Sequence, residues 1–188
     1  MRVPEMKKIL LLVLGCLAFP AFGAEVAGVK IDDKIRIGSA ELTLSGAGLR
    51  KRVFFQVYVI GLYVSDRKAD LVTQPGLKRV AIHMLRDVGA EQFTEALADG
   101  IRANHPEAEG KALEPRVKEL GAMMAEIKEA KKGMVIALDW TGSATQLVID
   151  GKPAARTIAG EDFYRALLRI WLGDKPVQDD LKKALLGG

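Results

Sequence analysis

Residues 42–65 constrain the fold most, because this segment is long, almost continuously apolar and patterned for β-structure. If residues 49–65 form one extended strand, successive side chains point to opposite faces. Both faces are then mostly apolar, and a strand of that kind has to be covered on both sides. The segment therefore predicts a central strand in a layered fold.

The hydrophobic period changes along the rest of the chain. Strand-like segments come first, two helical segments follow, and then a strand pair and two more helices. This segregation predicts an α+β fold, in which an antiparallel β-sheet carries a helical layer on one face, in a single domain over residues 24–188. Strands are expected at 26–37 with a turn at Asp32–Asp33, 40–46, 49–65, 78–85, 134–140 and 144–150, and helices at 89–105, 112–133, 160–173 and 176–188.

The first 23 residues have the pattern of a secretory signal peptide. A basic start, MRVPEMKK, precedes the apolar run ILLLVLGCLAF, which is too short to span a bilayer, and small residues follow. We expect cleavage after Gly23 or Ala24 and a periplasmic or secreted protein. Two alternatives stay open: a lipoprotein anchored through Cys16, and an uncleaved anchor.

Composition and motifs narrow the chemistry. Cys16 is the only cysteine, so a processed chain has neither a thiol nucleophile nor a disulfide. Basic residues alternate with acidic ones, which gives no basis for a nucleic-acid partner. His83 and His105 have no second ligand at metal-binding spacing, and no phosphate-binding glycine loop occurs, so no metal or cofactor is expected. A Ser-His-Asp triad is neither indicated nor ruled out.

One polar stripe remains on the long predicted strand. Arg50, Phe54 and Tyr58 share a face there, about 13 Å apart at each step if the strand is straight. A guanidinium at one end of an apolar groove suits an anionic head group, because its planar fork pairs with a carboxylate through two bonds. The alternative is an arginine that pairs with a structural Asp or Glu at the edge of the strand.

The stretch LSGAGLRKRVFFQVYVIGLYV resembles the signature of the chalcone isomerase family: a glycine-rich turn, an arginine, and a long strand that ends in Gly-aliphatic-Tyr. Later segments that resemble the family follow in the same order: AEQFTEALADGIRA, DWTGSATQLVIDGK and GEDFYRALLRIWLGDKPVQDDLKKALL. The resemblance is strongest to bacterial chalcone isomerase-like proteins with leader peptides. It implies an open-faced β-sandwich: a large antiparallel sheet, a helical layer and a few short strands.

The resemblance also shows where this chain departs from plant chalcone isomerases. Arg50 matches their substrate-holding arginine, whereas Tyr58 stands in place of a threonine. Phe93 stands where their active-site helix has a tyrosine, and Gly100 where it has an asparagine. Tyr164 falls near a further hydroxyl position. Losing one donor to the developing charge typically costs ~10²–10³ in rate, so the departures favour binding over ring closure.

The family's fatty-acid-binding branch keeps the arginine and adds a tyrosine on the same strand, as Arg50 and Tyr58 do here. The resemblance therefore implies a non-catalytic binding protein for a fatty acid or similar amphipathic carboxylate. Two alternatives stay open: an intramolecular lyase or isomerase acting on an enone or flavonoid-like ligand through Arg50 and Tyr164, and a structural partner protein. The oligomeric state is left open. In the binding hypothesis Arg50 and Tyr58 hold the anion, and Phe54, Ile60, Phe93 and Leu97 line the apolar part.

Overall fold

The computed structural model describes residues 23–67 and 70–188. The expected leader, apart from Gly23, lies outside these residues. The strands are β1 (Glu25–Val26), β2 (Val29–Lys30), β3 (Lys34–Ile37), β4 (Ala40–Arg52), β5 (Phe55–Val64), β6 (Lys78–Met84), β7 (Val88–Gly89), β8 (Glu129–Ala130), β9 (Val135–Trp140), β10 (Ala144–Ile149) and β11 (Lys152–Ala159). The helices are α1 (Ala90–Ala103), α2 (Glu107–Ala125), α3 (Glu161–Leu172) and α4 (Asp179–Leu185).

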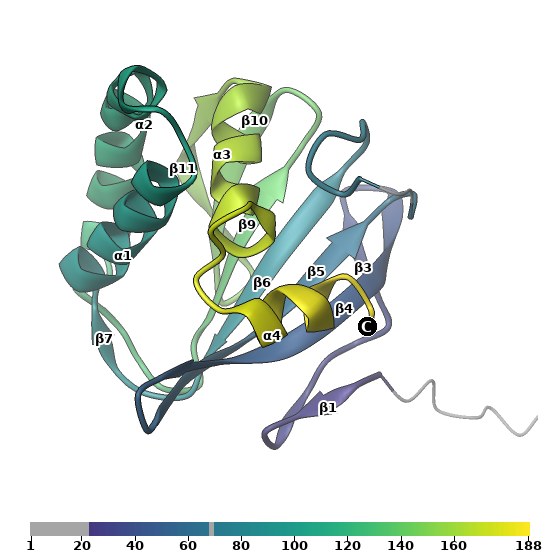
Figure 1. The fold of residues 1–188 in the computed structure, drawn as a ribbon. Coiled ribbons are helices and arrows are strands. Elements are labelled where there is room, and N and C mark those ends of the chain that lie inside the picture. The colour runs from purple at the N-terminus through teal and green to yellow at the C-terminus, as the bar shows by residue number, and fades with distance from the viewer. Residues whose placement is uncertain (1–22, 68–69) are drawn as a thin grey trace, which may run out of the picture.

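A curled sheet of seven strands, in the order β11-β10-β9-β6-β5-β4-β3, forms the centre of the molecule. All its neighbouring strands are antiparallel. The helices lie on one side of the sheet, with α4 across β4 (Figure 1). This arrangement confirms the predicted α+β class and the helical layer on one face.

Apolar side chains are buried on both faces of the sheet. Ile60 and Ile82 point into the main core, between the sheet and the helices, where they meet the apolar sides of α1 and α3. Val59 and Tyr63 point into a smaller core on the other face, which the N-terminal segment covers with Ile31. The expectation that the central segment is covered on both sides is therefore confirmed.

The predicted single strand from residue 49 to residue 65 is wrong. The chain reverses between β4 and β5, and Val53 and Phe54 form the turn. β4 instead runs through the glycines at positions 46 and 48, where the family resemblance led us to expect a glycine-rich turn. The reversal places Arg50 directly opposite Tyr58 in the register of the β4–β5 pair. In the predicted single strand the two residues would lie far apart along the same face, with Phe54 between them.

Three other boundaries differ from the prediction. The first chain reversal is at Ala27–Gly28, between β1 and β2, and not at Asp32–Asp33. The second helix begins earlier than expected and ends at Ala125, because residues 129–130 pair with β7 as β8. The edge strand β11 was not predicted, since its sequence KPAARTIA has no clear alternation.

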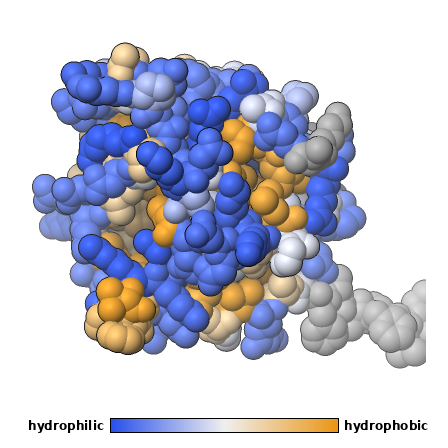
Figure 2. Space-filling view, viewed as in Figure 1, coloured by the Kyte–Doolittle hydropathy of each residue, from blue (hydrophilic) through white to orange (hydrophobic). Residues whose placement is uncertain are grey.

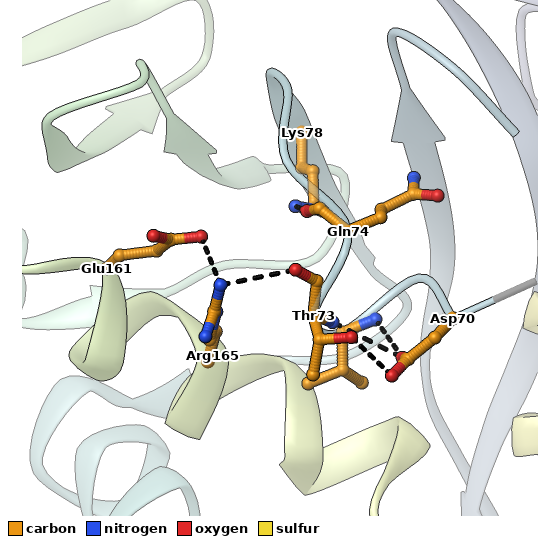
Figure 3. A network of polar contacts seen from close by, with 7 residues as sticks. Asp70, Thr73, Gln74, Lys78, Glu161 and Arg165 are labelled. Atoms are coloured by element: carbon orange, nitrogen blue, oxygen red, sulfur yellow. Dashed lines mark hydrogen bonds and ion pairs between the residues drawn. The ribbon is translucent and has the colours of Figure 1, made fainter. Parts of the chain in front are cut away.

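A polar network fastens the segment between β5 and β6 to α3 (Figure 3). Asp70 accepts a hydrogen bond of 2.5 Å from the Thr73 hydroxyl, and Arg165 of α3 donates to the Thr73 carbonyl at 3.2 Å. The buried Lys78 ammonium donates to the Gln74 carbonyl at 2.5 Å, and burial lowers the pKa of Lys78. The network fixes one end of α3, the helix that also carries Trp171.

Candidate ligand-binding site

A cavity of about 810 Å³ opens between the helical layer and the end of the sheet that carries the β4–β5 hairpin. Its walls come from the hairpin, β6, α1, α3 and the segment between α3 and α4. Ligand pockets in proteins typically fall between ~300 and ~1,000 Å³, so the cavity has the size of a small-molecule site. The lining residues are Arg50, Arg52, Val53, Phe55, Val57, Tyr58, Ile82, Arg86, Asp87, Val88, Gln92, Phe93, Ala96, Leu97, Asp99, Gly100, Ala103, Ile170, Trp171, Lys175, Pro176 and Val177.

The Arg50 guanidinium is held at the edge of β4 by neutral groups. Its Nη1 donates to the Lys51 carbonyl at 2.5 Å and to the Gln178 Oε1 at 3.3 Å. In the described part of the chain no carboxylate forms an ion pair with it. The alternative considered from the sequence, in which the arginine forms an ion pair with a structural Asp or Glu, therefore does not describe Arg50.

Gln178, just before α4, connects this helix to the outer edge of β4. β3 pairs with β4 only as far as Thr43, so the later edge groups of β4 need other partners. The Gln178 Oε1 accepts from the Lys51 amide at 2.8 Å, and its Nε2 donates to the Leu49 carbonyl at 3.0 Å. One side chain thus satisfies two backbone groups and also touches Arg50.

Tyr58 is partly buried beside Arg50, and its hydroxyl accepts a 3.0 Å hydrogen bond from the Trp171 Nε1. Because the indole N–H can only donate, the phenol proton remains available for an acceptor in the cavity. Burial raises the pKa of Tyr58, although the Trp171 hydrogen bond and the Arg50 charge act in the opposite direction. The phenol is therefore neutral, and a proton donor, at physiological pH.

The deeper wall of the cavity is apolar. Phe93 and Leu97 are one helical turn apart on α1 and are both buried, so they present one continuous surface with Ile82 of β6. Gly100, one turn further, lies against α3: a Cβ atom there would be 2.7 Å from the Ile170 Cγ2. The close helix contact accounts for the glycine at the position where the family resemblance leads one to expect an asparagine.

Positive charge predominates among the lining residues, with Arg50, Arg52, Arg86 and Lys175 against Asp87 and Asp99. The two carboxylates are also engaged elsewhere. Asp99 pairs with Arg102 on the same helix, and Asp87 accepts from the Lys132 amide at 2.7 Å. The field at the opening of the cavity therefore favours an anion.

The structure brings together four of the predicted site residues, Arg50, Tyr58, Phe93 and Leu97. Three others lie elsewhere. Phe54 is at the hairpin tip and 94% exposed, and Ile60 is part of the main core. Tyr164 is buried away from the cavity, where its hydroxyl donates to the Leu138 carbonyl at 3.0 Å.

Trp171 and Gln178 are the site residues that sequence reasoning missed. They lie 113 and 128 positions from their partners Tyr58 and Arg50. Trp171 is inside a predicted amphipathic helix, where a buried tryptophan is ordinary core, and nothing in the local pattern distinguishes it. Only the packing of α3 and α4 against the hairpin shows their roles.

Comparisons with known proteins agree on the fold. A family model described as chalcone isomerase-like matches residues 23–187. Among solved structures, the crystal structure of the Arabidopsis thaliana fatty-acid binding protein AtFAP1 is similar, with a TM-score of 0.68 and 14% sequence identity over 85% of this chain and 92% of that chain. At this identity the likeness is one of fold. A search of curated proteins found no match.

Proposed function

The chain belongs to the chalcone isomerase-like family, and on this premise we propose that it binds a fatty acid or a similar amphipathic carboxylate without transforming it. The observation that carries the proposal is the direct pairing of Arg50 with Tyr58 at the wall of an apolar cavity. Arg50 supplies a positive charge that no described carboxylate compensates. Tyr58 supplies a neutral donor beside it.

A carboxylate fits this pair chemically. One oxygen can accept from the guanidinium through a charge-assisted bond, and the Tyr58 hydroxyl can donate to the same head group. The apolar tail would then lie along Phe93 and Leu97, where each buried methylene contributes about 0.8 kcal/mol. The AtFAP1 structure supports this proposal to the extent that a protein named for fatty-acid binding has the same fold.

The location of the protein is a separate proposal. The pattern of residues 1–23 supports a protein that is exported and processed near Gly23 or Ala24. No helix in the described part of the chain has the length and apolar character needed to cross a bilayer. The intact mass of the protein recovered from cells tests the proposal, and a lipid adduct on Cys16 would show a lipoprotein instead.

Titration with a fluorescent fatty acid at two salt concentrations tests the binding proposal. Arg50→Ala should lose ~2–4 kcal/mol, roughly 30-fold to 1000-fold in affinity, because the charge-assisted bonds disappear. Arg50→Lys should restore only part, since a point charge does not reproduce the fork. Tyr58→Phe should cost less, ~0.5–1.5 kcal/mol.

Two other arginines serve as controls. Arg36 is exposed on β3 and does not line the cavity, so Arg36→Ala should bind like the wild type. Arg52 lines the opening and should contribute mainly a salt-sensitive attraction. Wild-type affinity in Arg50→Ala would refute the proposal, and so would equal losses in Arg50→Ala and Arg52→Ala that occur only at low salt.

A further inference from the structure

The tip of the β4–β5 hairpin exposes three consecutive large apolar side chains. Val53 is 79% exposed, Phe54 94% and Phe55 60%. Apart from Leu186, these are the exposed large hydrophobic residues of the described chain. Figure 2 shows a compact apolar patch at the lower left, where Figure 1 places the hairpin tip. Single exposed apolar residues are ordinary, but a contiguous group at a projecting turn indicates an interaction site.

The backbone of the turn is also unfavourable. Val53 has a φ of 56°, in the left-handed region that β-branched residues rarely occupy. A glycine or asparagine would adopt this conformation at lower cost. The turn thus combines backbone strain with solvent-exposed apolar surface. Strained positions of this kind cluster at functional sites.

Basic residues surround the apolar tip. Arg50, Lys51 and Arg52 precede it on β4, and residues 49–57 include no acidic side chain. Arg86 lies over the Phe55 ring at 4.6 Å from its centroid. Lys51, Arg52 and Arg86 are exposed, and we call them the basic collar. An apolar tip inside a basic collar is complementary to a surface that is negatively charged outside and apolar within.

We propose that this hairpin docks the protein on an anionic phospholipid bilayer. Val53, Phe54 and Phe55 enter the interface between head groups and acyl chains, while the basic collar pairs with lipid phosphates. Arg52, Val53 and Phe55 also line the large cavity, so docking places the opening of that cavity at the bilayer surface. The docking inference rests on the hairpin alone and does not require the cavity to bind a carboxylate.

A second copy of the chain is a poorer occupant of the tip. Two tips that meet about a twofold axis would bring the two basic collars together, and like charges in contact oppose association. The apolar group has only three residues, whereas a stable protein interface takes roughly 20–30 residues from each partner. A bilayer needs only a small inserted group together with the electrostatic attraction.

An environment-sensitive dye on an introduced cysteine tests the proposal. Gln56→Cys, in full-length protein with Cys16→Ser, reports on the tip while leaving Val53, Phe54 and Phe55 in place. Leu186→Cys in the same background is the matched control, because Leu186 is also apolar and 43% exposed but lies at the C-terminal end. Both proteins are mixed with vesicles of phosphatidylcholine alone, or of equal parts phosphatidylcholine and phosphatidylglycerol.

We expect the emission of a dye at position 56, but not of a dye at position 186, to shift to the blue on vesicles that contain phosphatidylglycerol. The shift should become smaller as the salt concentration rises. Phe54→Ser should reduce the fraction of protein that binds the vesicles through the tip about tenfold. The double variant Lys51→Glu with Arg52→Glu should reduce it roughly 30-fold. The double variant Lys118→Glu with Lys152→Glu reverses the charge of two exposed lysines outside the hairpin and changes the net charge by the same amount. It should reduce vesicle binding far less. Thermal melting of Phe54→Ser should match the wild type, because the Phe54 side chain is 94% exposed.

Three results would overturn the proposal. If the protein binds the vesicles but the emission of the dye at position 56 does not change, another part of the chain binds lipid. An equal, salt-independent shift on both lipid mixtures would remove the role of the collar. A shift that appears without vesicles and grows with protein concentration would show that a second copy covers the tip.

Discussion

Gln178 shows how a single residue can set the strength of the candidate site. Its Oε1 lies 3.3 Å from the Arg50 Nη1 and 2.8 Å from the Lys51 amide, so it positions the guanidinium without neutralising it. A carboxylate at the same place would keep these two contacts and add an ion pair, but it would lose the Nε2 donor to the Leu49 carbonyl. The neutral amide therefore leaves the charge of Arg50 available to a ligand.

This role predicts opposite effects on stability and on binding. Gln178→Glu should unfold at a similar or higher urea concentration than Gln178→Ala, because both variants lose the donor to the Leu49 carbonyl but only glutamate keeps the acceptor for the Lys51 amide. It should nevertheless bind a fluorescent fatty acid more weakly, by about 1.5–3 kcal/mol relative to the wild type, since the new carboxylate competes for the guanidinium. Gln178→Ala should lose about 1 kcal/mol or less in affinity. If Gln178→Glu binds as tightly as the wild type, Arg50 does not hold the ligand.

The contact of α4 with β4 depends on two glycines. A Cβ atom on Gly46 would be 2.0 Å from the Ala184 carbonyl oxygen, which is backbone and cannot rotate away. A Cβ atom on Gly48 would be 2.6 Å from the Leu181 Cδ1, the movable end of a side chain. The helix can therefore lie directly on the strand only while position 46 has no side chain.

Alanine substitutions measure this dependence. Gly46→Ala should lower the free energy of unfolding by about 1–3 kcal/mol, and Gly48→Ala by less. Gly89 is the control, because its added Cβ would meet nothing within 4 Å and its φ is −57°. Gly89 is the N-cap of α1, where alanine is less favourable than glycine, so Gly89→Ala should lower stability by only about 0.5–1 kcal/mol. Urea unfolding checks the order, and equal stability of Gly46→Ala and Gly89→Ala would mean that α4 can shift at little cost.

The elements also show what the sequence could and could not predict. The class of fold and most of the strands and helices follow from the change in hydrophobic period, which is a local signal. The turn at Val53–Phe54 does not, because it contains no glycine, proline or asparagine and its first residue is β-branched. Arg50 and Tyr58 were nevertheless assigned to one face correctly, since directly paired residues of a hairpin share a face just as alternate residues of a strand do.

For the whole molecule, the three tyrosines report on the intact fold. Burial is the largest cause that raises the pKa of Tyr58, Tyr63 and Tyr164 above the usual value. Tyr63 lies in the smaller core and the other two on the helical side of the sheet. Both faces therefore have to open before all three phenols can ionise.

An alkaline titration tests this inference. The unfolded chain loses its tyrosine protons near pH ~10, whereas the folded chain keeps them. The contribution of the tyrosines to stability should then be constant below about pH 10 and fall as the pH rises further, because the unfolded state binds fewer protons there. The near-ultraviolet tyrosinate band of the folded protein should stay absent past that pH and appear together with unfolding. A phenol that titrates reversibly near pH ~10 in the folded protein would contradict the burial of that side chain.

The order of strands in the large sheet has a consequence for how the protein behaves at high concentration. An open sheet has two edges, and an edge with unpaired backbone groups invites another chain to add to it. Here one edge strand, β3, has four residues and bears Lys34 and Arg36, and the other, β11, contains Pro153 and a break in its register with β10. Gln178 pairs with backbone groups of β4 beyond the end of β3. Each edge is thus short, charged, interrupted or capped, and these features oppose fibril-like growth of one molecule upon another.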